Sequence, residues 1–134
     1  MRYVLDSSAI IAYLWDERGA AVTDSLLSDR SLQCYAHAIN VCEVYYHLLR
    51  HSSEKDAEGV LTALLEAGLL LRSDMDTGMW KQAARFKSLG RIALADCFCL
   101  ALAKRLDATV VTADRHEFEP LVAQGDAQPI LFIR

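Results

Sequence analysis

The chain has 134 residues, 53% of them hydrophobic and 24% charged, and it carries a net charge of −4. This length suits a single ordinary domain over residues 1–134, and the composition excludes a disordered or collagen-like chain. The acidic net charge disfavours strong non-specific binding to nucleic acid, unless the acids gather where a divalent cation covers them.

No apolar run approaches the ~20 residues that a membrane span needs, so we expect no membrane association. The chain opens directly with a strand-like run, which predicts no secretory leader and a cytoplasmic protein. The four cysteines, at positions 34, 42, 97 and 99, form no C-x-x-C pair. We therefore expect reduced thiols that act as small core hydrophobes, and no structural zinc site.

Short β-like runs alternate with helical stretches along the sequence. The first half predicts, in chain order, a strand over Tyr3–Leu5, helices from Ser7 or Ser8 to Leu14 and over Ala20–Leu27, a strand over Leu32–Tyr35, a helix whose apolar period runs from Val41 to Leu49, and a helix over Glu54–Glu66. The second half predicts a strand over Leu69–Leu71, helices over Asp76–Leu89 and Leu94–Leu106, a strand over Thr109–Thr112, a short helix over Phe118–Ala123 and a last strand over Ile130–Phe132. This alternation predicts an α/β domain, with a parallel central sheet of about five short strands flanked by helices.

Two acidic residues follow predicted strands directly. Asp6 comes after the first strand, and Asp114 comes after Thr109–Thr112 with one residue between. Because the carboxyl ends of parallel strands meet at one edge of a sheet, these distant acids are expected to converge there. Taken alone, Asp6 could instead cap the following helix, and Asp114 could be an ordinary loop residue.

Two further acids lie on predicted helices. Asp96 interrupts an apolar run, and an unpaired buried carboxylate costs several kcal/mol, whereas the helix dipole returns only ~0.3–1 kcal/mol in the first turn. We therefore expect Asp96 to be paired or bound to a metal ion. Glu43 lies beside the apolar stripe near the start of its helix, and its simpler interpretation is a solvated residue bonded to His47 at i+4.

A cluster of three or four carboxylates favours a hard divalent cation, because such ions take oxygen ligands. Without a cation the acids would repel one another and raise each other's pKa. Bound metal ions can activate water against a phosphodiester, so no nucleophilic side chain is needed. The sequence carries no G-x-S-x-G motif and no Cys/His pairing signal that would supply one.

Four segments then resemble a known family: Val4–Leu14, Asn40–Val44, Leu94–Phe98 and Val111–Arg115. In this order and spacing they look like a PIN domain, and within that family like the VapC-like toxins of bacterial toxin–antitoxin pairs. The resemblance covers essentially the whole chain. It implies a Mg²⁺- or Mn²⁺-dependent endoribonuclease on a parallel five-stranded sheet.

Carried over residue by residue, the resemblance implies that Asp6, Glu43 and Asp96 are the three core catalytic and metal-binding acids. Asp114 matches the usual fourth acid, and Glu117 is the alternative for that role. Hydroxyl groups that support the metal site through hydrogen bonds are implied at Ser7, Ser8 and Thr112.

The resemblance also implies an RNA substrate, a homodimer, and an antitoxin that covers the active site or inserts a basic side chain among the acids. Aromatic residues that would suit a protein interface are Tyr13, Trp15, Tyr45 and Tyr46. We expect His116 to be a surface histidine rather than a general base.

Contacts to RNA would come from local basic groups that hold phosphates without reading bases. The candidates are Lys81, Arg85, Lys87, Arg91 and Arg115. The simpler interpretation of each is a solvated charge.

Three other functions compete with the nuclease. The same fold could be a catalytically silent module that docks a protein partner. An aspartyl-phosphate phosphotransferase would use Asp6 as nucleophile, but Ser7 and Ser8 supply no second acid beside it. A receiver-like signalling domain fits poorly, because Asp96 lies inside a buried helical run.

Overall fold

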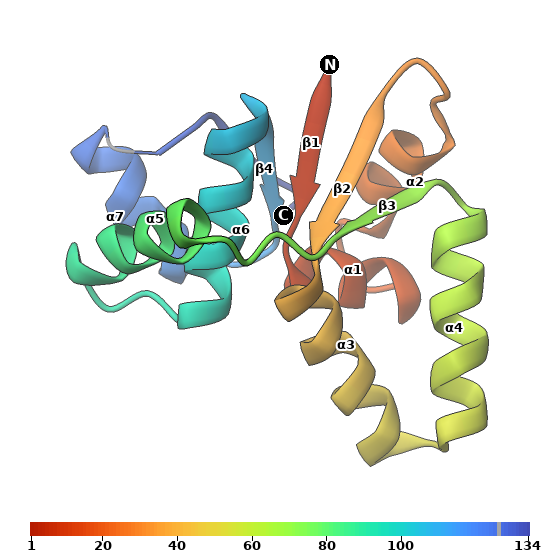
Figure 1. The fold of residues 1–134 in the computed structure, drawn as a ribbon. Helices are drawn as coiled ribbons and strands as arrows, with labels where there is room; N and C mark the ends of the chain where they lie inside the picture. The colour runs from red at the N-terminus through yellow and green to blue at the C-terminus, as the bar shows by residue number, and fades with distance from the viewer. Residues whose placement is uncertain (126) are drawn as a thin grey trace.

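The fold is described by a computed structural model that covers residues 1–125 and 127–134. A five-stranded parallel sheet has the order β3-β2-β1-β4-β5 (Figure 1). The strands are β1 (Arg2–Leu5), β2 (Gln33–His37), β3 (Leu69–Arg72), β4 (Thr109–Thr112) and β5 (Ile130–Phe132). The helices are α1 (Ser7–Leu14), α2 (Ala20–Ser28), α3 (Ala38–His51), α4 (Glu54–Glu66), α5 (Thr77–Ser88), α6 (Leu94–Leu106) and α7 (Arg115–Gln124). The predicted α/β architecture is confirmed.

The element boundaries differ from the predicted ones where side chains cap helices. Strand β2 continues to His37, whose Nδ1 accepts a hydrogen bond from Ile39 N at 3.1 Å and starts α3 at Ala38. Helix α7 begins three residues earlier than predicted, because the Asp114 carboxylate accepts from Glu117 N at 3.1 Å. Both caps use side chains that apolar periodicity does not reveal.

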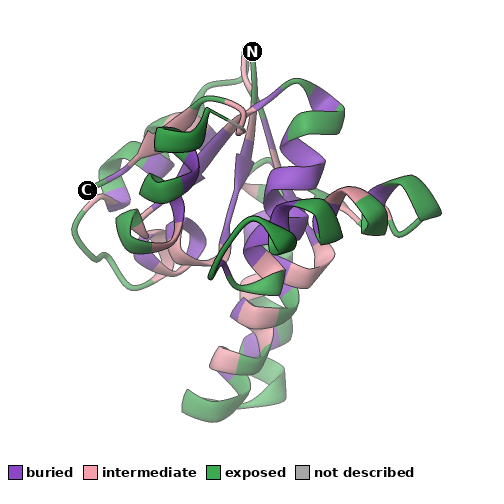
Figure 2. Ribbon diagram, turned by 90° about the vertical axis from the view of Figure 1, so that its left-hand side faces the viewer, coloured by how far each residue is buried: buried purple, intermediate pink, exposed green. Residues whose placement is uncertain are grey.

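Consecutive strand residues point to opposite faces of the sheet. Both faces are buried, because helices cover each of them. Val4 and Val110 pack in a core formed with α5, α6 and α7, whereas Leu5 and Val111 pack with α1, α3 and α4. Every residue of α6 from Cys97 to Ala103 is buried, so α6 is the central helix that its apolar composition predicted. Figure 2 shows the buried positions on the central strands and on the inward faces of the helices.

The strand order reverses at one place in the sheet. The chain moves outward from β1 to β2 and β3, and then returns through α5 and α6 to place β4 on the other side of β1. In open parallel sheets, ligands bind in the crevice beyond the carboxyl ends of the strands at such a reversal. The ends of β1 and β4 are therefore the place to look for a site.

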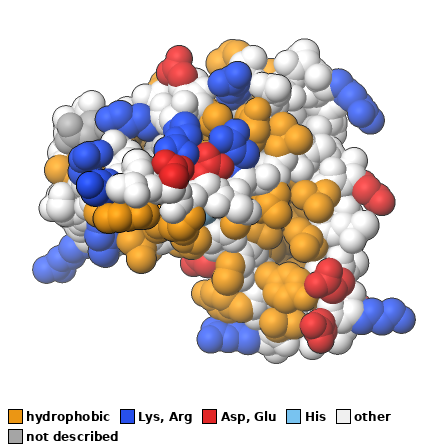
Figure 3. Space-filling view, viewed as in Figure 1, with side chains coloured by type: hydrophobic (Ala, Val, Ile, Leu, Met, Phe, Trp, Pro, Cys, Tyr) orange, Lys and Arg blue, Asp and Glu red, His pale blue; other side chains and the backbone are white. Residues whose placement is uncertain are grey.

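The surface carries apolar groups of its own. On the face shown in Figure 3, hydrophobic side chains gather over α3 and α4, and the exposed apolar residues of these helices include Tyr46, Leu49 and Leu65. Within the residues that the structure describes, no helix has the length and apolar character to cross a membrane. The four cysteines are free thiols, of which only Cys42 is exposed.

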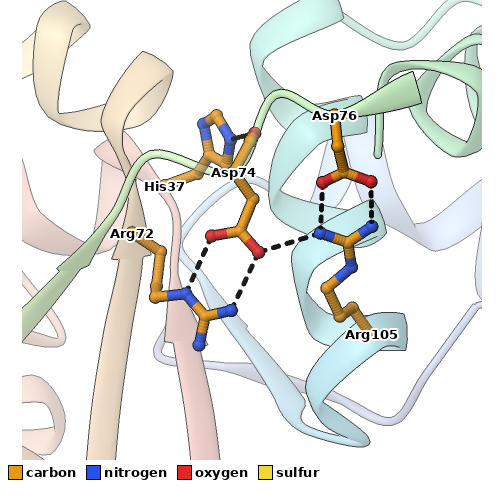
Figure 4. Close-up of polar contacts among 5 residues, drawn as sticks. All are labelled: His37, Arg72, Asp74, Asp76 and Arg105. Atoms are coloured by element: carbon orange, nitrogen blue, oxygen red, sulfur yellow. Dashed lines mark hydrogen bonds and ion pairs between the residues drawn. The ribbon is translucent and has the colours of Figure 1, made fainter. Parts of the chain in front are cut away.

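An ion-pair network fixes the segment that leads from β3 to α5 (Figure 4). Asp74 accepts two hydrogen bonds from Arg72 at 2.8 Å each and one from Arg105 at 2.9 Å. Arg105 also donates to both carboxylate oxygens of Asp76, at 2.6 and 2.8 Å. His37 Nε2 lies 2.8 Å from the Asp74 carbonyl oxygen, and because His37 Nδ1 is an acceptor, Nε2 carries the proton. The network joins the ends of β2 and β3 to α6.

Asp74 is the centre of this network, and hydrogen bonds from Arg72 hold its pKa well below the usual 3.8. We expect Asp74→Asn to lower the free energy of unfolding by about 1–3 kcal/mol at neutral pH. A depressed native pKa contributes stability above the unfolded pKa and loses it as the pH falls through the native pKa, so the loss should shrink below pH 4. Urea unfolding from pH 7 to pH 3 measures this, with the exposed Asp24→Asn as control. An equal loss at every pH would contradict the ion-pair explanation.

Candidate active site

Asp6 lies at the end of β1, with its backbone N–H donating to the oxygen of Val111 in β4 at 3.1 Å. The residue is 1% exposed, and its carboxylate accepts hydrogen bonds from Thr112 Oγ1 at 2.5 Å, Ser8 Oγ at 2.7 Å and Ala9 N at 2.9 Å. Burial raises the pKa of Asp6 to about 6, against the opposing effect of these three bonds. Asp6 is therefore a helix cap and, at the same time, a carboxylate fixed at the adjacent carboxyl ends of β1 and β4.

The hydroxyls of Ser8 and Thr112 connect the two strand ends. Their oxygens lie 3.2 Å apart, and each also accepts a backbone hydrogen bond, from Ala113 N at 2.9 Å and Asp114 N at 3.0 Å respectively. The loop after β4 is thereby tied to the start of α1. Both hydroxyls donate to the Asp6 carboxylate, and their role in supporting a metal site stays a prediction.

Asp96 lies in the first turn of α6 and is 8% exposed. Burial is the largest cause that raises the pKa of its carboxyl to about 8, and the charges of Asp6, Glu117, Glu43 and Asp114 contribute the rest. Across residues 1–125 and 127–134, no group donates a hydrogen bond to this carboxylate. The fold therefore brings the predicted acids within electrostatic reach of one another, from β1, α3, α6 and α7.

Asn40 is a positioning residue that the sequence analysis did not select. It is fully buried; its Oδ1 accepts from Ser7 N at 3.3 Å and its Nδ2 donates to Ala95 O at 3.1 Å, which joins the starts of α1, α3 and α6. The Ser7 hydroxyl in turn donates to Glu43 Oε1 at 3.0 Å. A signal was present, since an amide on an apolar helix face must find hydrogen-bond partners when buried.

The two candidates for the fourth acid lie at the start of α7: Asp114 is its N-cap, and Glu117 is in its first turn. The Asp114 carboxylate caps this helix, and Glu117 Oε2 accepts a hydrogen bond from Ala93 N at 3.0 Å. Glu117 thus braces the loop that leads into α6 and its Asp96. Both acids are near enough to raise the pKa of Asp96, and Glu117 has the larger effect.

The donor set suits a hard divalent cation in kind, because carboxylates are the protein ligands that Mg²⁺ and Mn²⁺ prefer. Its arrangement is open: among the described residues, no three His, Cys, Asp or Glu side chains are placed to hold one metal ion together. Burial is the main cause of the raised pKa values of Asp6 and Asp96, because it disfavours their charged forms, and a bound cation would favour those forms instead. The residues fit such an ion by their chemistry, and Asp96 accepts no hydrogen bond from the described residues that would hold its carboxylate away from the ion.

The predicted RNA contacts divide into two groups. Lys87 Nζ donates to a backbone oxygen of the α5–α6 loop at 2.6 Å, and Arg115 donates to the backbone oxygen of Arg134 at 2.8 Å. These two side chains therefore stabilise the fold through hydrogen bonds, in addition to contributing positive charge to the surface. Exposed candidates without such a backbone bond are Lys81, Arg85 and Arg91.

A family profile described as "PIN domain" matches residues 3–120. The chain belongs to the PIN domain family. The matched range contains Asp6, Glu43, Asp96 and Asp114, so the resemblance noted from the sequence is confirmed at the level of the family. A comparison with curated proteins gave no match.

Solved structures share this PIN domain fold at low sequence identity. A toxin–antitoxin complex from Klebsiella pneumoniae is 14% identical, with a TM-score of 0.72 over 98% of both chains. FitAcB from Neisseria gonorrhoeae is 24% identical, with a TM-score of 0.67 over 98% of this chain and 97% of that chain. VapC20 from Mycobacterium tuberculosis, described as a sarcin–ricin loop cleaving toxin, is 10% identical, with a TM-score of 0.68 over 88% and 94%. At these identities the likeness concerns the fold.

The acid cluster makes a prediction about stability. Because the native pKa of Asp96 lies near 8 and its ordinary value is 3.8, the unfolded chain loses this proton at a lower pH than the native protein does, and stability falls as the pH rises between these values. We expect Asp96→Asn to raise the free energy of unfolding by an amount on the order of 2 kcal/mol at pH 8 in EDTA, with a smaller gain at pH 5. Urea unfolding checks this, with Asp24→Asn on α2 as the exposed control. A destabilised Asp96→Asn protein at pH 8 would show that Asp96 is a structural partner instead.

Proposed function

We propose that this PIN domain protein is a divalent-metal-dependent endoribonuclease and the toxin of a toxin–antitoxin pair. One observation carries the proposal: Asp6, Glu43, Asp114 and Glu117 surround Asp96 so closely that their charges add to the effect of burial on its pKa. Such a cluster weakens a fold when it is empty, because like charges disfavour ionisation. Its natural counterpart is a cation together with an anionic substrate.

The ion that we propose is Mg²⁺ or Mn²⁺, held by Asp6 and Asp96 with Glu43 and Asp114. When bound, such an ion supplies an activated water and neutralises charge on a phosphodiester. The side chains do the positioning: Thr112 and Ser8 donate to Asp6 and favour its charged form. Ser7 donates a hydrogen bond to Glu43 Oε1 and so orients that side chain.

RNA is the substrate that we propose, in a chain that forms one domain over residues 1–134 and works in the cytoplasm. Support comes from VapC20, a protein of the same fold described as cleaving the sarcin–ricin loop. Exposed cations on α5 and on the loop that follows it would offset the acidic net charge for a phosphate backbone. They are Lys81, Arg85 and Arg91.

An antitoxin and a second copy of the chain are the proposed protein partners. The Klebsiella pneumoniae protein of this fold comes from a toxin–antitoxin complex. Of the aromatic residues predicted for an interface, Trp15 and Tyr46 are 41% and 42% exposed, whereas the Tyr45 hydroxyl donates to Glu58 at 2.8 Å. A hollow of about 660 Å³ that includes Trp15 and Leu48 offers apolar surface for a partner.

A second candidate is the catalytically silent PIN domain that docks a partner without cleaving RNA. The open arrangement of the acids favours it, because no three of the described His, Cys, Asp or Glu side chains converge on one point. The two candidates differ in turnover, so a cleavage assay separates them.

The decisive assay incubates the purified protein with RNA in Mn²⁺ and in EDTA. We expect cleavage in Mn²⁺ only, and a loss of at least about a hundredfold in Asp6→Asn and Asp96→Asn, because each removes a metal ligand. Asp24→Asn, an exposed acid on α2, is the matched control and should cleave like the wild type. Cleavage that persists in EDTA or in Asp96→Asn would exclude the proposed mechanism, and no cleavage by any form would favour the silent module.

The fourth acid can be assigned with two isosteric variants. We expect Asp114→Asn to reduce the cleavage rate by about tenfold or more, because a carboxylate oxygen on the crevice is lost. Glu117→Gln should keep most activity, since its amide oxygen can still accept from Ala93 N. Rates measured at saturating Mn²⁺ test this, and a larger loss in Glu117→Gln would assign the role to Glu117.

A further inference from the structure

A hollow of about 260 Å³ opens between α7 and the loop that joins α5 to α6. Ile92, Pro120 and Leu121 give it apolar walls, and Ile92 and Leu121 are each 3% exposed. Its polar lining comes from exposed side chains, which include Arg91 and Gln124. This volume lies just below the ~300–1,000 Å³ of pockets for drug-sized ligands, and it suits a single ring system.

Glu117 places this hollow directly beside the acid cluster. The residue lines the hollow, its Oε2 accepts from Ala93 N at 3.0 Å, and its charge acts on Asp96. Ala93 is the N-terminal cap of α6, three positions before Asp96. One ligand can therefore reach both the hollow and the acids.

Two planar side chains line the hollow, the Arg91 guanidinium and the His116 imidazole. Unpaired RNA bases stack on guanidinium planes and on aromatic rings such as imidazole. Arg91 is exposed and forms no ion pair or hydrogen bond with any described residue, in contrast to Lys87 and Arg115. The Gln124 amide adds both a donor and an acceptor for the edge of a base.

From this geometry we infer that the hollow binds one unpaired nucleobase of a single-stranded RNA, next to the phosphodiester at the acids. The inference builds on the proposed ribonuclease function and adds a base-binding site to it. A charged or strongly polar ligand would leave the apolar walls, whose exposed surface includes Leu89 and Pro120, without apolar contact. A base satisfies both halves of the hollow, with its flat faces against apolar groups and its edge towards polar ones.

The test measures binding of a fluorescent single-stranded RNA by anisotropy, in Ca²⁺ and with the RNA checked for integrity on a gel. A second set of oligonucleotides lacks one base at each position in turn. Wild-type binding should weaken about tenfold when the base for the hollow is missing. The double variant Arg91→Ala/His116→Ala should bind the intact RNA about tenfold more weakly, and the same missing base should then cost little more, since the two changes remove one contact.

The control double variant, Arg30→Ala/His51→Ala, removes the same charge and ring at exposed positions outside the hollow. It should bind like the wild type and keep the full effect of the missing base. The inference would be overturned if the missing base weakened binding equally in the wild type and in Arg91→Ala/His116→Ala, or if the wild type bound no RNA. A hollow that binds a peptide would give the first of these results. Cleavage in Mn²⁺ is scored separately, so a failed nuclease with a retained base effect would remove the proposed function and leave the hollow.

Discussion

The burial of two carboxyl groups, those of Asp6 and Asp96, is the constraint around which this PIN domain is organised. Each carboxyl has its pKa raised chiefly by burial, to about 6 and about 8. The two are treated differently: Asp6 accepts three hydrogen bonds, whereas Asp96 receives none from the described residues. Ionising a buried carboxyl that has no partner costs several kcal/mol, and the packing of the surrounding core must supply the stability that offsets this cost.

The topology meets this constraint by ending strands and starting helices at one place. Asp6 and Thr112 come from the adjacent ends of β1 and β4, and α1, α6 and α7 all begin beside them. The N-terminus of a helix carries partial positive charge, so these starts offset part of the repulsion among the acids. Asn40 then fixes the starts of α1, α3 and α6 relative to one another with its two hydrogen bonds.

The sequence predicted the elements and the convergence of acids because both follow from general rules of periodicity and sheet topology. Periodicity locates strands and helices, and parallel strands must present their carboxyl ends at one edge, which brings Asp6 to Asp114. Contacts between side chains from separate loops follow no such rule. Periodicity does not specify the loop paths that allow Ala93 N to donate to Glu117. The same holds for the ion pairs among Arg72, Asp74 and Arg105. For the same reason Asn40 was seen within a motif and not as a positioning residue.

The central claim is that the acids at the ends of β1 and β4 form one cation site. A crystal structure grown with Mn²⁺ tests it most directly, because the anomalous scattering of manganese locates the ion independently of any assumed ligand. We predict one Mn²⁺ or more bound to oxygens of both Asp6 and Asp96, with Asp96 turned towards the ion. Crystals at saturating Mn²⁺ that show no ion between these two carboxylates, or an ion held elsewhere, would contradict the account.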